Sequence, residues 1–250
     1  MSGWPLLVLD FDGVICDSID ECFVSSWIAY HTLYKKDPPP HVSVMLKKDF
    51  TRLRPFIRSG EDYVLIQEIL RSDERVPDQA AFDALIRKAG PEKMGRFKEL
   101  FTQARTDLLA RDRRFWLSLN RIYPHMLAAF AHLPKKAPVR VLSTKEPEFI
   151  AEILEYAQIR IPRDRILRSP SDRKLPIVEE LRSSEGCERA IFIDDQIDYL
   201  LGSMFPRIEA YLASWGYVKE EWLTGKLPVS IITSDNLMRL IEREFPPEPL

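Results

Sequence analysis

The sequence predicts an α/β protein in which a doubly wound parallel sheet is interrupted by a helical insertion. A short apolar strand at residues 5–9 opens the chain, and a long region of helical periodicity follows from Ile19 to about Leu119. From Val139 onward, apolar runs of strand length alternate with helical segments, which is typical of a parallel sheet flanked by helices. We therefore expect an α/β core of residues 1–17 and 119–250 and an all-helical domain of residues 18–118.

The first strand ends in two aspartates one residue apart. Its apolar residues predict a fully buried strand, which Gly13 ends. Because side chains alternate along a strand, Asp10 and Asp12 point to the same face. Two neighbouring carboxylates repel each other and are costly to desolvate. A bound divalent cation would make the arrangement favourable, so the pair predicts a cation or catalytic site.

Several elements are predicted from periodicity alone. Apolar residues recur every three or four positions near 19–30, 63–70, 82–86 and 94–108, which predicts a helix at each. The prolines at 38–40 break the chain between the first two, and a short helix over 126–133 returns it to the core. Residues 229–232 predict a last strand, and Ser234 or Asp235 is expected to cap a final helix through Ile241.

The second apolar strand, residues 139–142, leads into Ser143 and Thr144, and Pro147 opens a helix just beyond. A hydroxyl and backbone N–H groups at a helix N-terminus form a ready anion site. Taken singly, Ser143 could equally be a helix cap.

Two further segments carry charged residues. Lys174 lies just before a helical run, and the apolar strand 190–193 ends in Asp194 and Asp195, with Asp198 following. Alone, the lysine could be a solvated charge and the aspartates a turn. In parallel sheets, however, ligands bind at the carboxyl ends of the strands. We therefore expect the ends of the three apolar strands to converge on one crevice.

The order of these features resembles the four motifs of the haloacid dehalogenase superfamily, in its phosphatase branch. The stretch from Asp10 to Ser18 is similar to the first motif, and Ser143, Lys174 and the Asp194-Asp195 pair follow in the order of the others. The resemblance implies a Rossmann-like core with a mobile helical cap inserted after the first motif. Among these enzymes, the arrangement most resembles the phosphoglycolate phosphatases.

The resemblance implies a role for each motif residue. Asp10 would be the nucleophile that forms an aspartyl-phosphate, and Asp12 the general acid and base. The dehalogenase branch lacks a carboxylate at position 12, so Asp12 favours phosphate esters over carbon–halogen bonds. Ser143, the backbone N–H of Thr144 and the ammonium of Lys174 would bind the phosphoryl group.

The resemblance also implies Mg²⁺ as the cofactor. The ion would be held by Asp10, the backbone carbonyl of Asp12 and the side chain of Asp194, with waters completing its shell. Asp195 and Asp198 would orient those waters, and the sequence leaves open which of the two matters more.

Two departures from the family pattern leave other functions open. Ile193 precedes Asp194 where many relatives have glycine, and Pro176 lies one place later than the common Lys-Pro pair. The leading hypothesis is a Mg²⁺-dependent phosphatase of a small phosphorylated metabolite. The alternatives are a non-catalytic phosphate-binding or regulatory protein on this scaffold, and a phosphomutase or phosphotransferase using the same intermediate.

Three arginines in the helical insertion are candidate substrate ligands. Arg52, Arg54 and Arg58 lie in a segment that Pro55 and Gly60 mark as a loop or helix end. Guanidinium groups suit carboxylate or phosphate, and such a set would fit a small acidic phosphoester such as phosphoglycolate. A solvated basic helix end explains the same residues equally well.

Composition bounds the partners and the compartment. The formal net charge is −2, which gives no general attraction to nucleic acid or anionic membranes. The three cysteines have no metal-ligand spacing and cannot all pair in disulfides, which favours a reduced intracellular chain. No apolar run approaches the roughly 20 residues of a membrane span, and no signal peptide is predicted. We therefore expect a cytoplasmic protein of undetermined oligomeric state.

Overall fold

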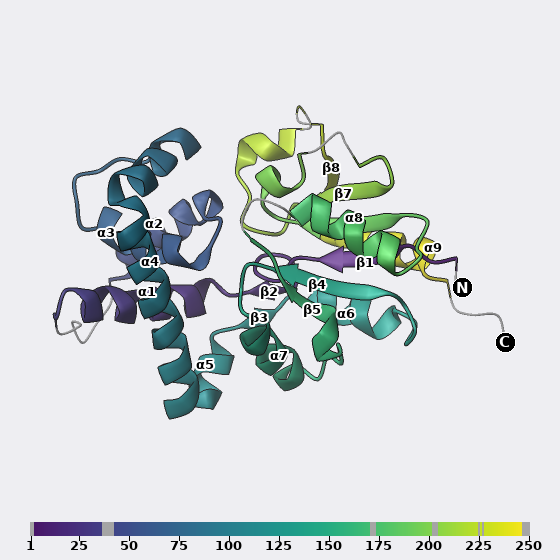
Figure 1. Ribbon diagram of the computed structural model, residues 1–250, viewed down its shortest axis with the longest axis horizontal. Coiled ribbons are helices and arrows are strands. Elements are labelled where there is room, and N and C mark those ends of the chain that lie inside the picture. The colour runs from purple at the N-terminus through teal and green to yellow at the C-terminus, as the bar shows by residue number, and fades with distance from the viewer. Residues whose placement is uncertain are drawn as a thin grey trace. The chain divides into compact units, whose positions relative to one another are not determined.

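The computed structural model describes residues 3–36, 43–170, 174–201, 205–224, 226 and 228–246, and it confirms the predicted fold class. The predicted break at Pro38 lies outside the described residues. Two compact units are present, one of residues 1–17 and 121–250 and one of residues 18–120 (Figure 1). Whether they act as separate domains stays a prediction, and each unit is described by itself.

The first unit is built on a sheet that has six parallel strands within the described residues, in the order β5-β4-β1-β6-β7-β8. The strands are β1 (Leu6–Leu9), β4 (Val139–Ser143), β5 (Ile166–Arg168), β6 (Ala190–Asp194), β7 (Ile208–Ala213) and β8 (Ser230–Ile232). At the centre, Leu9 is paired with Val141 on one side and Ile193 on the other. The ends of β1, β4 and β6 therefore meet at the same edge.

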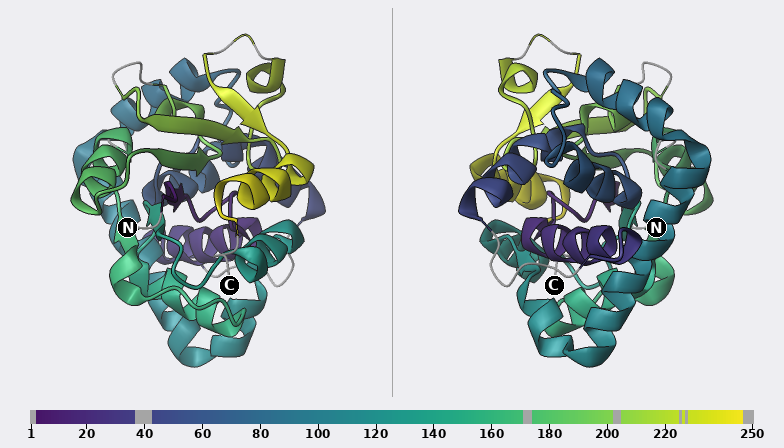
Figure 2. Two further views of the ribbon diagram at one scale, coloured as in Figure 1. Left: turned by 90° about the vertical axis from the view of Figure 1, so that its right-hand side faces the viewer. Right: turned by 90° about the vertical axis from the view of Figure 1, so that its left-hand side faces the viewer.

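Helices cover both faces of this sheet. They are α6 (Pro124–His132), α7 (Pro147–Tyr156), α8 (Lys174–Ser184) and α9 (Ser234–Glu244), with short turns of 3₁₀ helix at η2 (Arg163–Arg165), η3 (Ile197–Tyr199) and η4 (Glu220–Thr224). On one face, Leu175 and Val178 of α8 pack in a buried cluster with Val8 and Phe192. Figure 2 shows α8 and α9 on opposite sides of the sheet. The N-cap of α9 is Thr233, whose side chain accepts the N–H of Asn236, so the expected cap at Ser234 or Asp235 is one or two residues too late.

A two-stranded antiparallel ribbon lies where the chain leaves and re-enters this unit. It consists of β2 (Cys16–Asp17) and β3 (Arg121–Ile122). Asp17 is paired with Arg121 in register, and the Arg121 guanidinium also donates to the Asp17 carboxylate at 3.0 Å. Strands of two residues carry no periodic signal, so the sequence did not predict this ribbon.

The second unit is helical, and its described residues form no strand. It contains α1 (Ile19–Leu33), α2 (Val44–Leu53), η1 (Arg54–Phe56), α3 (Gly60–Ile69), α4 (Gln79–Arg111) and α5 (Arg113–Ser118). The predicted helices near 82–86 and 94–108 meet at a kink to form α4. There Gly90 has φ of 78° and is followed by Pro91, and both residues disfavour a continuous helix. Across the described residues, no helix has both the length and the apolar character needed to cross a bilayer.

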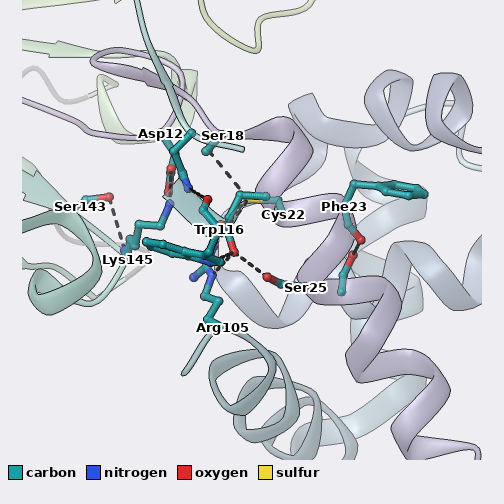
Figure 3. Close-up of polar contacts among 12 residues, drawn as sticks. Asp12, Ser18, Cys22, Phe23, Ser25, Arg105, Trp116, Ser143 and Lys145 are labelled. Carbon is teal, nitrogen blue, oxygen red and sulfur yellow. Dashed lines mark hydrogen bonds and ion pairs between the residues drawn. The ribbon is translucent and has the colours of Figure 1, made fainter. Parts of the chain in front are cut away.

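A buried ion pair and the hydrogen bonds around it join three of these helices. Glu21 of α1 accepts two hydrogen bonds from Arg105 of α4, at 2.9 and 2.8 Å, and both side chains are at most 3% exposed. The same carboxylate accepts the Ser25 hydroxyl at 2.6 Å and the Trp116 indole N–H at 3.3 Å (Figure 3). Because the charge is paired and hydrogen-bonded, its burial is tolerated, and the network fixes α1, α4 and α5 to one another.

Asp62, in the first turn of α3, is a buried carboxylate of a different kind. Its Oδ2 accepts the backbone N–H groups of Arg58 and Ser59, at 2.9 and 3.1 Å. Burial raises the pKa of Asp62 to about 7, although the two backbone hydrogen bonds oppose the rise. Between about pH 4 and pH 7, the folded state therefore holds a proton that the unfolded chain has lost.

This burial predicts a pH-dependent stability. Because the folded pKa lies above the unfolded one, the unfolding free energy should fall as the pH rises from about 4 to about 7 and then level off. Asp62→Asn keeps an acceptor for both N–H groups and does not ionise, so its stability relative to the wild type should rise by about 2–3 kcal/mol between pH 5 and pH 8. Urea unfolding at the two pH values measures the difference. Asp78→Asn, at the exposed N-cap of α4, is the matched control, and the same pH profile in all three proteins would contradict the assignment.

Candidate active site

The carboxyl edge of the sheet brings together residues that are far apart in the sequence. Asp10 directly follows β1, Ser143 ends β4 and Asp194 ends β6. The backbone N–H of Asp10 donates to the carbonyl of Ile193 at 2.9 Å, which extends the pairing of β1 and β6 by one residue. The convergence expected of a parallel sheet is therefore present.

Three buried carboxylates form the centre of this edge. Asp10, Asp194 and Asp195 each offer an oxygen atom, and these atoms lie within 4.8 Å of one another. Their exposed fractions are 6%, 0% and 3%. A set of carboxylate oxygens suits a hard cation such as Mg²⁺.

Lys174, the first residue of α8, is the counter-charge of this cluster. Its Nζ donates to Oδ1 of Asp10 at 2.8 Å and to Oδ2 of Asp194 at 2.7 Å. Burial disfavours the ammonium, but the charges of Asp10 and Asp194 outweigh burial and raise the pKa of Lys174 above its ordinary value. The two carboxylates therefore stabilise the charged form of the lysine.

The cluster retains an excess of negative charge. Burial raises the pKa of Asp194 to about 8; Lys174 opposes the rise, and the charges of Asp10 and Asp195 add to it. Asp194 also accepts the backbone N–H of Gln196 at 2.8 Å, which orients its carboxylate. One ammonium cannot neutralise three ionised carboxylates, so without a cation Asp194 holds a proton. A divalent cation would take the place of that proton, and the oxygen ligands suit it.

A second lysine, to which the sequence analysis gave no role, holds Asp12. Nζ of Lys145 donates to Oδ1 of Asp12 at 2.8 Å, and the lysine side chain is 1% exposed (Figure 3). The backbone N–H of Lys145 donates to Oγ of Ser143 at 3.4 Å. The only sequence signal was its place, two residues after Ser143 in the loop before α7.

Asp195 and Asp198 differ in their surroundings. Asp195 belongs to the cluster, and its Oδ2 accepts the backbone N–H of Tyr217 at 2.8 Å. Asp198 lies on η3 with an exposed side chain and is not a member of the cluster. Of the two residues that the sequence left as alternatives, the structure brings Asp195 to the site.

Four residues predicted to bind substrate or phosphate remain: Thr144 and the arginines Arg52, Arg54 and Arg58. Thr144 lies half-buried in the loop that joins β4 to α7. In the helical unit, Arg52 is exposed, and its Nε lies 3.7 Å from Asp49. Arg54 is buried, with its guanidinium over the ring of Tyr63. Arg58 pairs with Asp83 at 2.6 Å. Each of the three arginines thus contacts a residue of its own unit. Their binding of substrate, and that of Thr144, stays a prediction.

Comparison with known proteins shows which fold this is. No protein-family model matches the sequence, and no curated protein matches it significantly. Among solved structures, two proteins named phosphoglycolate phosphatases by prediction only are similar. The protein from Lactobacillus delbrueckii subsp. bulgaricus is 14% identical with a TM-score of 0.64, over 98% of this chain and 99% of that one. The protein from Haemophilus somnus is 14% identical with a TM-score of 0.60, over 96% and 99%.

A haloacid dehalogenase-like family hydrolase from Streptococcus pneumoniae is 11% identical, with a TM-score of 0.58 over 96% of this chain and 99% of that one. The chain has the fold of the haloacid dehalogenase-like hydrolases. At these identities the likeness establishes the fold and leaves the chemistry to be argued from the residues. The buried Asp10, Asp194 and Asp195 cluster lies at the carboxyl edge of the sheet, where open α/β folds bind their ligands.

Proposed function

We propose that this protein is a Mg²⁺-dependent phosphatase of a small phosphorylated metabolite, acting through an aspartyl-phosphate on Asp10. The observation that carries the proposal is the position of Asp10 at the tip of the central strand, buried and 2.8 Å from the ammonium of Lys174. A buried carboxylate held against a fixed cation is suited to attack an anionic phosphoryl group, because the cation offsets the repulsion between them.

In the first half of the reaction, a carboxylate oxygen of Asp10 attacks phosphorus, and the bond from phosphorus to the leaving oxygen breaks. Asp12 gives its proton to that oxygen. Lys145, 2.8 Å from Oδ1 of Asp12, orients this carboxyl group. Ser143 and the Thr144 N–H would bind phosphoryl oxygens, and Lys174 neutralises charge beside Asp10.

In the second half, Asp12 takes a proton from a water molecule. The water attacks the phosphorus of the aspartyl-phosphate, which releases inorganic phosphate and restores the Asp10 carboxylate. Mg²⁺ would be held by Asp10, Asp194 and the backbone carbonyl of Asp12, with Asp195 orienting its waters. When bound, it supplies positive charge beside the phosphoryl oxygens.

The test is phosphate release by the purified full-length chain. With Mg²⁺ and p-nitrophenyl phosphate we expect turnover, and removal of the metal with EDTA should abolish it until Mg²⁺ is restored. A panel of phosphorylated acids, sugars and nucleotides, with phosphoglycolate included, would then identify the substrate class. Binding of phosphate or Mg²⁺ without hydrolysis of any compound would contradict the proposal and favour the non-catalytic alternative.

A phosphotransferase is the second candidate. One similar solved structure is the protein tyrosine kinase A of Mycobacterium tuberculosis, which is 16% identical with a TM-score of 0.55, over 95% of this chain and 98% of that one. An aspartyl-phosphate on Asp10 could be passed to a hydroxyl other than water. The products formed in the presence of tyrosine peptides and sugars distinguish the two functions. Release of about one inorganic phosphate per substrate consumed supports hydrolysis, and accumulation of a phosphorylated acceptor supports transfer.

A further inference from the structure

The loop after β7, residues 214–217, binds three other segments of the same unit. The indole N–H of Trp215 donates to the carbonyl of Val14 at 3.1 Å. The backbone N–H of Tyr217 donates to Oδ2 of Asp195 at 2.8 Å, and the phenol of Tyr217 donates to Oδ1 of Asp17 at 2.9 Å. One residue therefore contacts both the acidic cluster and the β2–β3 ribbon.

The Asp195 end of this connection is tightly packed. A Cβ atom on Gly13, whose φ is +95°, would lie 1.9 Å from Oδ2 of Asp195, and one on Gly216 would lie 2.4 Å from the Asp195 Cβ. Only glycine leaves room at both positions. The Asp195 carboxylate is thus fixed between the turn after β1 and the loop after β7.

The Asp17 end belongs to the ribbon where the chain leaves and re-enters the unit. Asp17 is the last residue before the helical unit, and its Oδ2 accepts from Arg121, the first residue after it. The phenol of Tyr217 takes the other oxygen, Oδ1. The loop after β7 is therefore anchored on a side chain of the ribbon.

We propose that Tyr217 is a positioning residue for Asp195. Its phenol anchors the loop on Asp17, and its backbone N–H then holds the Asp195 carboxylate in the orientation that the metal site requires. The inference rests on the proposed Mg²⁺ site. Partners that hydrogen-bond the ligands of a metal change its affinity by about 10–100-fold when removed. Tyr217 acts one step further from the metal, so loss of this anchor should be visible in Mg²⁺ binding at the lower end of that range.

The experiment is calorimetric titration of the metal-free full-length chain with Mg²⁺ alone. Tyr217→Phe removes the phenol hydroxyl and keeps the backbone N–H, and it should raise the Kd for Mg²⁺ by about tenfold, the lower end of the range for such groups. Asp17→Ala removes the same bond and should have the same effect, and the double variant should be no weaker than either. Asp17→Asn keeps an acceptor for the phenol and should bind Mg²⁺ nearly as the wild type does.

Tyr211→Phe is the matched control. Tyr211 lies on β7, and its hydroxyl donates to Glu209 at 3.1 Å, so the variant should bind Mg²⁺ as the wild type does. A Tyr217→Phe protein that unfolds at a lower temperature but has a Kd for Mg²⁺ within twofold of that of the wild type would overturn the inference. Tyr217 would then be a structural residue. Additive effects of Tyr217→Phe and Asp17→Ala would overturn the inference as well.

This measurement separates the inference from the proposed function. Mg²⁺ binding needs no turnover, so a protein that binds Mg²⁺ with these differences but hydrolyses nothing would support the role of Tyr217 and contradict the phosphatase. A wild-type chain that binds no Mg²⁺ would overturn the inference, since Asp195 would then have no metal to serve.

Discussion

Asp10→Asn should lower phosphatase turnover by on the order of 10³-fold or more, because an amide cannot act as the nucleophile and covalent catalysis is lost. The amide oxygen can still accept the hydrogen bond from Lys174, so the fold should persist. Phosphate release by the variant, measured with Mg²⁺ and the substrate that the wild type turns over, checks the prediction.

Two further variants make this result specific. Asp78→Asn changes an aspartate at the exposed N-cap of α4 and should leave turnover unchanged. Asp12→Asn should slow turnover by about 10²–10⁴-fold, since it removes only the proton transfer. Unfolding by urea or heat confirms that each variant is folded, and equal rates for the wild type and Asp10→Asn would remove Asp10 as the nucleophile.

Lys174→Met should be the most destabilising change at the site. It leaves the carboxylates of Asp10 and Asp194 buried without their counter-charge, and removing one partner of a buried ion pair costs about 3–5 kcal/mol. The unfolding free energy in urea, measured without divalent metal, checks the prediction. Turnover should fall as well, since the cation beside the nucleophile is lost.

Two further variants test whether the loss of stability comes from the unpartnered carboxyl groups. Adding Asp194→Asn to Lys174→Met replaces one of the two carboxyl groups that lose their partner with a group that cannot ionise, so the double variant should be more stable than Lys174→Met alone. Lys145→Met removes a cation from Asp12, whose side chain is less deeply buried than those of Asp10 and Asp194, and should cost less. Unfolding free energies for Lys174→Met equal to those of the wild type would mean that Lys174 is not the counter-charge of the cluster.

The fold class could be predicted, and so could the convergence of Asp10, Ser143 and Asp194 at one edge of the sheet, because both depend on short, strongly patterned segments. The strands β1 and β6 are runs of apolar residues; Asp10 directly follows β1, and β6 ends in Asp194. A parallel sheet then places those ends together without any knowledge of side-chain contacts. In the second unit, α1, α3 and α4 carried the periodicity that predicts them, whereas α2 and α5 were not predicted.

Other features could not be predicted because no local pattern encodes them. The strand β7 is only partly buried and contains Glu209, so it lacks a continuous apolar run. The hydrogen bond between Tyr217 and Asp17 joins residues 200 positions apart, and that between Lys145 and Asp12 joins residues 133 positions apart. Such contacts follow from the assembled sheet, which explains why Lys145 and Tyr217 were missed. Lys174 was singled out only because the order of the motifs resembles that of a known family.

Trapping the phosphorylated protein tests the central claim most directly. The Asp12→Asn variant, incubated with p-nitrophenyl phosphate and Mg²⁺ and quenched in acid, should retain the phosphoryl group, because this leaving group needs no proton while hydrolysis of the intermediate needs the base. Mass spectrometry of its peptides should place one phosphoryl group on Asp10, and none in an Asp10→Asn/Asp12→Asn protein. Phosphate release by the wild type with no phosphoryl group on Asp10 in the variant, or with one on another residue, would contradict the account.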